Sequence, residues 1–267
     1  MNGIREKLSN MFSKVMAGTV TREEGTILLN SLVREDKAGT VRELSALIDS
    51  PPSGVFPKTI LHTISLARNK AFYNIIVACL DHKDEGVAIL AAHELAMQRT
   101  SDAREVLTEH LASDMYHVRK ASATALVEGF GREGVGILKR ELARHPEPFY
   151  RTTYAEAIFR AGRPGVEALV DTLRDGGGAA ATAAETLIAS GADLTAEDAP
   201  KIIEALTSAG DRRDTRLIVP LLGLVASFGA RARRAYEGFV RVFLDHPSDD
   251  VRRAARDALA SSTHGAV

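Results

Sequence analysis

The sequence predicts an all-α protein in which similar helix pairs stack one on the next. A repeated segment is the first indication, because VRKASATAL at 118–126 returns as VRRAARDAL at 251–259. Composition agrees: 45% of the residues are hydrophobic, only 5% are aromatic, none is Trp, and alanine, the best helix former, is abundant. The apolar residues of the repeated segment recur at helical spacing, and no segment is typical of a strand.

Weaker copies of the segment lie between these two. VAILAAHEL at 87–95 and YRTTYAEAI at 150–158 keep an apolar first residue, small or apolar residues in the middle, and Leu or Ile at the end. A period of this size is typical of a stacked repeat array. The first three copies end at Leu95, Leu126 and Ile158, which are 31 and 32 residues apart, and degraded copies end near Leu187 and Gly223.

Each repeat is predicted to contain two helices. Val118, Ala121 and Ala125 share one helical face, because they occupy positions i, i+3 and i+7. A glycine such as Gly131 then interrupts the helix, and a second stripe of apolar residues follows at 135–142. The expected pairs span about 40–67, 69–98, 100–129, 132–161, 163–190, 195–228 and 230–262.

Two more helices are expected ahead of these pairs, over 3–17 and 21–35. The sequence therefore predicts two parts. The first is a helical hairpin over 1–37 that caps the array, and the second is a repeat array of about seven helix pairs over 38–267.

Local signals mark where the first helices begin and end. Thr21 is followed three residues later by Glu24, which predicts a capping box in which each side chain hydrogen-bonds the other residue's backbone amide. Thr40 and Glu43 repeat this pattern. The pair at 51–52 is Pro-Pro, which is expected to end the helix that precedes it.

Composition and charge favour a cytoplasmic protein. The formal net charge is −1, and no apolar run approaches the roughly 20 residues of a membrane-spanning helix. Cys79 is the single cysteine and lies in the apolar run IIVACL, which favours a buried structural thiol over a nucleophile and excludes a disulfide within the chain. No cofactor is expected.

The repeats at 80–262 resemble HEAT repeats, and in particular the short bacterial kind shared with phycobilisome-lyase-type proteins. VRKASATALVEGFG and VRRAARDAL carry the resemblance most clearly, while 40–79 matches loosely and the first 37 residues do not match. The resemblance implies a right-handed α-α superhelix, a HEAT-like solenoid, here with an N-terminal helical hairpin. In such arrays the second helices line a concave surface that most often holds another protein.

The resemblance also implies a role for the basic residue at the second position of each copy. This residue matches a family position where an Arg pairs with an Asp of an inter-helix turn. An anion-binding track is the alternative, and the structural pairing is favoured because acids recur beside the arginines. The arginines are Arg119, Arg151, Arg216 and Arg252, and the expected partners are Asp114, Asp214 and Asp249 or Asp250.

A metal site is not expected. HEAT-like deoxyhypusine hydroxylases build a two-iron site from His-Glu pairs in several repeats, but this chain has one such pair, His93-Glu94. The equivalent positions hold Thr124-Ala125, Glu156-Ala157 and Asp257-Ala258, which lack the ligands of a two-metal centre.

Three other interpretations are weaker. Nucleic acid binding is suggested by the arginines of 231–256, but acids are interleaved with them and there is no Trp to stack on a base. A bilin lyase activity would follow from the resemblance, yet repeats alone transfer architecture and not chemistry. The Gly-rich stretch at 176–184 lacks the flanking signals of a phosphate-binding loop and instead predicts a loose turn before a thinly packed helix.

The sequence therefore favours a non-catalytic scaffold or adaptor that binds another protein. Positions three and seven of each copy are four residues apart and share one helical face. They are not needed for packing between repeats, so they are available to contact a partner. The acidic middle of this strip, Glu156 and Glu185, predicts a partner with a basic segment. The partner-binding residues predicted on this basis are Lys120, Thr124, Thr152, Glu156, Glu185, Arg253 and Asp257.

Overall fold

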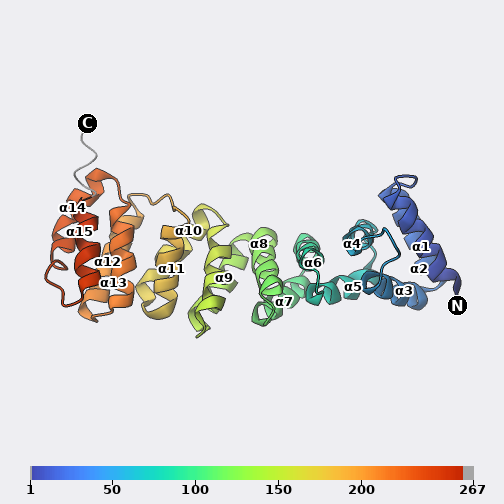
Figure 1. Cartoon of the computed structure of the whole chain (residues 1–267), viewed down its shortest axis with the longest axis horizontal. Coiled ribbons are helices and arrows are strands. Elements are labelled where there is room, and N and C mark those ends of the chain that lie inside the picture. The colour runs from blue at the N-terminus through green and yellow to red at the C-terminus, as the bar shows by residue number, and fades with distance from the viewer. Residues whose placement is uncertain (1, 261–267) are drawn as a thin grey trace. The chain divides into compact units, whose positions relative to one another are not determined.

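The chain has the all-α fold that the sequence predicts. The computed structural model describes residues 2–260, and within this range no residue belongs to a strand (Figure 1). Helices account for 80% of the chain. They are arranged as consecutive antiparallel pairs with short connections, as expected of a helical-repeat protein.

The helices form two compact units, an N-terminal unit within Met1–Phe130 and a C-terminal unit within Gly131–Val267. The division falls inside helix α8 (Tyr116–Arg144), where Gly131 has φ 52° and ψ −123°. Glycine reaches positive φ at little cost because it has no Cβ, so this residue ends one helix and begins the next. Helix α8 is therefore two helices, which belong to the third and fourth predicted pairs.

In the N-terminal unit the predicted hairpin packs directly on the first pair. Helix α1 contacts α3, and α2 contacts α4. The side chains of Leu8, Phe12, Leu29, Leu44 and Ile60, which come from all four helices, are fully buried. The helices are α1 (Asn2–Met16), α2 (Arg22–Glu35), α3 (Lys37–Asp49), α4 (Pro57–Leu66), α5 (Tyr73–Ala78), α6 (Glu85–Gln98), α7 (Ser101–Glu109) and the first part of α8.

One of the two predicted capping boxes is confirmed and the other is wrong. The Thr21 amide donates to the Glu24 carboxylate at 2.8 Å, and the Glu24 amide donates to the Thr21 hydroxyl at 3.2 Å. Thr40 instead lies inside α3, because Asp36 caps this helix four residues earlier through the amide of Gly39. The buried Thr40 hydroxyl donates to the Asp36 carbonyl at 2.7 Å.

The C-terminal unit contains the remaining four pairs at the predicted places. Its second helices, α9, α11, α13 and α15, pack side by side in that order. Helix α11 is wrongly predicted as thinly packed, because its small residues let it contact α9, α10 and α13 closely. The helices are the second part of α8, α9 (Pro148–Phe159), α10 (Arg163–Thr172), α11 (Gly177–Ala189), α12 (Asp198–Asp211), α13 (Thr215–Ala226), α14 (Ala230–Arg241) and α15 (Asp249–Ala260).

Glycine permits a close approach between α6 and the first part of α8 in the N-terminal unit. A Cβ on Gly129 would lie 2.7 Å from the carbonyl oxygen of Ala96 and 2.8 Å from its Cβ. Real Cβ atoms do not approach this closely, so a larger residue would push α6 and α8 apart. The small residues of the repeat thus set the spacing between consecutive pairs.

The second-position arginines bind backbone carbonyls of the preceding turn. Arg119 donates to the Ser113 carbonyl at 2.7 Å, and Arg151 and Arg252 donate to the His145 and His246 carbonyls at 3.0 and 2.6 Å. In each case the acceptor lies six residues before the arginine. Arg252 also pairs with Asp249, as expected. The principal acceptor of this recurring contact was not predicted, since it is main chain.

The expected pairing of Arg216 with Asp214 is wrong. Arg216 is exposed, and within residues 2–260 it forms no ion pair. The burial of Leu217, Leu221 and Val225 shows why, because these match Val118, Ser122 and Leu126 in the clearest copy. The repeat register on α13 therefore begins at residue 217, and its second position is apolar.

A buried acid ties two consecutive pairs of the C-terminal unit together. Asp198 at the start of α12 is 1% exposed and accepts two hydrogen bonds from Arg163 of α10, at 2.7 and 2.8 Å. The Thr195 amide and hydroxyl donate to the same carboxylate. Burial alone would raise the pKa of Asp198, but the hydrogen bonds from Arg163 and Thr195 outweigh it and hold this pKa below its usual range.

We predict that Arg119→Ala lowers the free energy of unfolding by about 1–3 kcal/mol, because it leaves the Ser113 carbonyl without its donor and removes a fully buried side chain. Urea denaturation followed by circular dichroism measures the change. Lys83→Ala, an exposed residue of the same unit, is the control and should stay within about 0.5 kcal/mol of wild type. Equal stability of the two variants would contradict the structural role of Arg119.

We predict that Asp198→Asn lowers the free energy of unfolding at pH 7 by about 1.5–3 kcal/mol. The pKa of Asp198 is lower in the folded than in the unfolded state, so the carboxylate stabilises the fold fully above an unfolded pKa of about 3.9. That stabilisation is lost as the pH falls through the folded pKa. Denaturation at pH 7 to 3 should therefore show the gap between wild type and variant closing in acid. Asp193→Asn, an exposed residue of the preceding loop, is the control, and a gap independent of pH would refute the assignment.

Candidate functional site

A polar groove runs across the second helices of the C-terminal unit. It encloses about 620 Å³ between α11, α13 and α15. Its walls combine charged, hydroxyl and apolar side chains, a mixture that suits a polypeptide better than a purely apolar ligand. The lining residues are Glu185, Thr215, Arg216, Val219, Pro220, Ser248, Asp250, Arg253, Ala254 and Asp257.

The charges of the groove are unevenly compensated. Asp250 pairs with Arg253 on the same helix. Glu185 on α11 and Arg216 on α13 are both exposed, and neither forms an ion pair with another residue in the described range. Two uncompensated charges of opposite sign therefore face a common concavity.

Pro220 interrupts the hydrogen bonding of α13 beside the groove. It lies inside α13 and has no amide hydrogen, so the helix lacks the donor that would normally bond to the Arg216 carbonyl. Both residues line the groove, together with Val219. The wall formed by α13 thus combines a cationic side chain with the apolar surfaces of Val219 and Pro220.

Three of the predicted partner-binding residues come together in this groove, namely Glu185, Arg253 and Asp257. Thr152 and Glu156 are exposed on α9, the helix that packs beside α11. The remaining two, Lys120 and Thr124, are half-buried on the first part of α8 and belong to the N-terminal unit.

The sequence did not reveal the contribution of α13. The sequence predicts no partner-binding residue on α13, because the degraded copy ending near Gly223 is set two residues too early and its outward face cannot be identified. Pro220 was the available signal, since a proline inside an apolar helix marks an unsatisfied carbonyl four residues earlier. The residues missed are Thr215, Arg216, Val219, Pro220, Ser248, Asp250 and Ala254.

Cys79 has the properties of a structural thiol. The residue is 4% exposed and packs at the end of α5. Burial, with a smaller effect from Asp49, raises the pKa of this thiol to about 12. A thiolate nucleophile is therefore disfavoured at neutral pH.

The single His-Glu pair of the sequence is divided between two contacts. His93 Nδ1 lies 3.7 Å from a carboxylate oxygen of Glu128 on α8, and Glu94 lies 4.0 Å from His62 Nδ1 on α4. Among the described residues, no three His, Cys, Asp or Glu side chains are grouped so that they could hold a metal ion. The two histidines thus make separate contacts with carboxylates of neighbouring helices.

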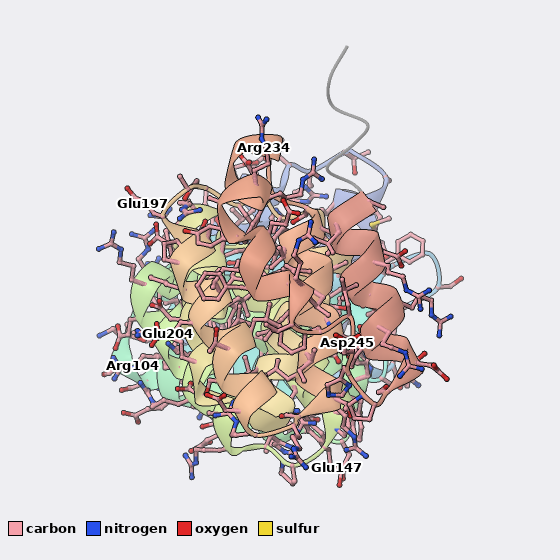
Figure 2. The ribbon with its side chains drawn as sticks, turned by 90° about the vertical axis from the view of Figure 1, so that its left-hand side faces the viewer. Arg104, Glu147, Glu197, Glu204, Arg234 and Asp245 are labelled. Carbon is pink, nitrogen blue, oxygen red and sulfur yellow. The ribbon has the colours of Figure 1, made fainter. Side chains whose placement is uncertain are left out.

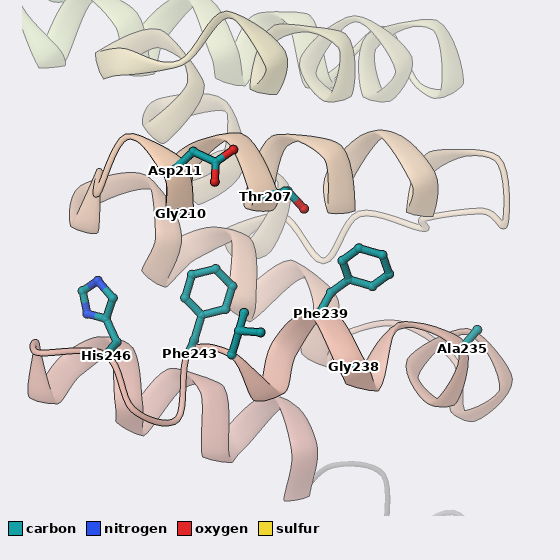
Figure 3. Close-up of a pocket in the computed structure, with 9 residues that line it drawn as sticks. Thr207, Gly210, Asp211, Ala235, Gly238, Phe239, Phe243 and His246 are labelled. Atoms are coloured by element: carbon teal, nitrogen blue, oxygen red, sulfur yellow. The ribbon is translucent and has the colours of Figure 1, made fainter.

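A second hollow lies between α12 and α14 of the same unit (Figure 3). It is largely apolar and includes Phe239, Val242 and Phe243. In contrast, charged side chains such as Glu197 and Arg234 project outward at this end of the molecule (Figure 2). The sequence signal for the hollow is the apolar spacing of Ala235, Phe239 and Val242, at the end of a helical segment that is otherwise rich in arginine.

In the part of the chain that the structure describes, no helix is both long enough and apolar enough to cross a membrane.

The sequence matches no family model and no curated protein. The chain is similar to several solved helical-repeat structures. One is an engineered protein, with 20% identity over 90% of this chain and 72% of that chain and a TM-score of 0.40. Another is human deoxyhypusine hydroxylase in complex with glycerol, with 17% identity, 98% and 97% coverage and a TM-score of 0.37.

A third is the complex of CpcE and CpcF of phycocyanin lyase from Nostoc, with 23% identity, 72% coverage of this chain, 65% of that chain and a TM-score of 0.27. Identities and TM-scores this low carry no argument about activity. The two natural proteins are HEAT-like helical-repeat proteins, and the chain described here is a helical-repeat protein by the arrangement of its own helix pairs.

Proposed function

We propose that this protein is a non-catalytic scaffold or adaptor that holds a segment of another protein across the second helices of its C-terminal unit. The observation that carries the proposal is the groove between α11, α13 and α15, in which Glu185 and Arg216 are exposed and uncompensated. A polypeptide segment offers what this groove lacks, namely backbone amide donors and side chains of both charges.

The partner segment is basic where it crosses α9 and α11. Glu156 and Glu185 occupy the same position of consecutive copies, and both are exposed on helices that pack side by side. Toward α15 the surface becomes mixed, because Arg216 and Arg253 join Asp250 and Asp257. A segment with two or more Lys or Arg residues followed by an acid matches this order of charges.

The corresponding surface of the N-terminal unit is proposed as an additional contact. Lys120 and Thr124 are partly exposed at the same repeat positions. We also propose that the hairpin over 1–37 acts as a cap, because its apolar face is buried on α3 and α4 while Ile27, on the other side of α2, is 68% exposed. Membership of the bacterial HEAT-like type and a cytoplasmic location belong to the same proposal.

Two alternatives make different predictions. A bilin lyase of the kind that the resemblance implies would bind a tetrapyrrole and become coloured when produced together with the pigment. A nucleic-acid-binding array would bind duplex or single-stranded DNA with an affinity that falls steeply with salt. Neither outcome is expected of a scaffold, so absorption spectra and a DNA titration separate the three functions.

We predict that Glu156→Lys combined with Glu185→Lys weakens binding of basic peptides by about tenfold or more, because two attractive contacts become repulsive. The peptides are selected against the full chain from a displayed library of 12-residue segments rich in Lys and Arg. Fluorescence anisotropy at low and high salt measures the affinity, and the variant should also lose most of the salt dependence.

The matched control is Asp193→Lys with Glu197→Lys, which changes the net charge equally at two exposed residues of the loop before α12. This control should leave the affinity within about twofold of wild type, since distant charges are screened. Equal weakening by both double variants would show that total charge, and not the proposed surface, governs binding.

A further inference from the structure

A groove with apolar walls separates α12 from α14 on the first-helix side of the C-terminal unit (Figure 3). It consists of two adjoining hollows of about 500 and 510 Å³, which share Thr207, Asp211 and Phe239. Phe243 packs against α12 at Gly210, because a Cβ built on this glycine would lie 3.1 Å from the Phe243 ring. The rings of Phe239 and Phe243 point toward α12.

Both walls of the groove carry residues at the spacing of a helix contact. On α12 these are Ile203, Thr207 and Gly210, at i, i+4 and i+7. On the other wall they are Ala235 and Phe239 of α14 and Val242, the residue that caps its C-terminus, again at i, i+4 and i+7. Ridges and grooves of this spacing accept the side chains of a third helix laid along them.

The α14 wall exposes more apolar surface than a solvent-facing helix needs. Phe239 is 48% exposed and Val242 is 70% exposed. Gly238 precedes Phe239 in the same wall, and a Cβ placed on it would meet nothing within 4 Å. An approaching backbone could therefore come close to α14 while larger side chains fill the space beside Phe239.

The charges that line the groove are acidic. Glu204 and Asp211 of α12 are the charged residues in its walls, and none of the lining residues that the structure describes is Lys or Arg. Glu204 is held by Arg174 at 2.8 Å. Asp211 is exposed and forms no ion pair with any residue of the range 2–260, so it can bind a cation on an incoming partner.

We propose that this groove docks an amphipathic helix of another protein, with large apolar side chains between α12 and α14 and a Lys or Arg facing Asp211. The wall from Pro200 to Asp211 is about 16 Å long, which matches three turns of helix. Docking of an apolar helical face in such a groove is a recurring mode of recognition. A second copy of this chain is a poorer occupant, since a symmetric contact would bring two acidic α12 walls together.

This docking site is independent of the polar groove. It uses α12 and α14, whereas the polar groove uses α11, α13 and α15, and it selects apolar anchors and not a basic extended segment. Each site can therefore fail its test without affecting the other.

The test is a selection against the full chain from a displayed library of 18-residue peptides. An apolar helical stripe is kept in the library, and the other positions vary among Lys, Arg, Glu, Gln and Ser. The enriched peptide is labelled, and its affinity is measured for wild type, Phe239→Ser, Val242→Ser and Asp211→Lys. Phe149→Ser is the matched control, because Phe149 is 55% exposed on α9 of the same unit.

The peptide should carry Lys or Arg on one flank and become helical when bound. Phe239→Ser and Val242→Ser should each lower the affinity for the peptide by about tenfold, as expected when a central anchor is removed. The affinity of the control variant should stay within about twofold of wild type. Asp211→Lys should also lower the affinity for the peptide. A selection repeated against this variant should enrich Glu in place of Lys or Arg on that flank. Because Val242 is mostly exposed, its variant should keep the wild-type melting temperature, which separates lost docking from lost folding.

The proposal is overturned if no peptide is enriched, if the enriched peptides stay unstructured when bound, or if they bind both serine variants as tightly as wild type. It is also overturned if sedimentation shows a dimer of the chain that Phe239→Ser dissociates, since a second copy would then occupy the groove.

Discussion

Every feature of this protein depends on one constraint, which is that a single helix pair cannot bury its own apolar face. Leu126 or Ile158 is removed from water only when neighbouring helices cover it. Burial then requires close approach, which small residues such as Gly129 and the alanines of α11 permit. Polar contacts act on top of this stacking: arginines fix the turns within pairs, and the Arg163–Asp198 contact joins one pair to the next.

Periodic features could be predicted from the sequence, and contacts with the main chain or between distant residues could not. The seven pairs follow from apolar spacing and glycine breaks, and the Thr21–Glu24 box follows from a local pattern. The cap predicted at Thr40 is wrong because Asp36, an equally good N-cap residue, lies four residues earlier and caps α3 instead. The arginine acceptors are backbone carbonyls, which no side-chain pattern encodes. Asp198 and Arg163 are 35 residues apart, so only the packing of α10 on α12 reveals their contact.

The candidate sites show the same division. Glu185, Arg253 and Asp257 were predicted from their repeat positions, and they line one groove because repeat positions map onto helix faces. Arg216 and Pro220 depend on the register of α13, which had drifted too far from the clear copies to be aligned. The apolar groove depends on how α14 lies against α12, and a short arginine-rich helix gives little indication of that arrangement.

The arginine contacts with the turns have a consequence for how such an array can diversify. The acceptor of Arg119 is the carbonyl of Ser113, while Arg151 and Arg252 use the carbonyls of histidines. Every amino acid supplies a carbonyl, so a substitution at the acceptor position leaves the hydrogen bond in place. The turns are therefore freer to drift than the helices they join, and foreign sequences could be grafted into them while the arginine anchor is retained.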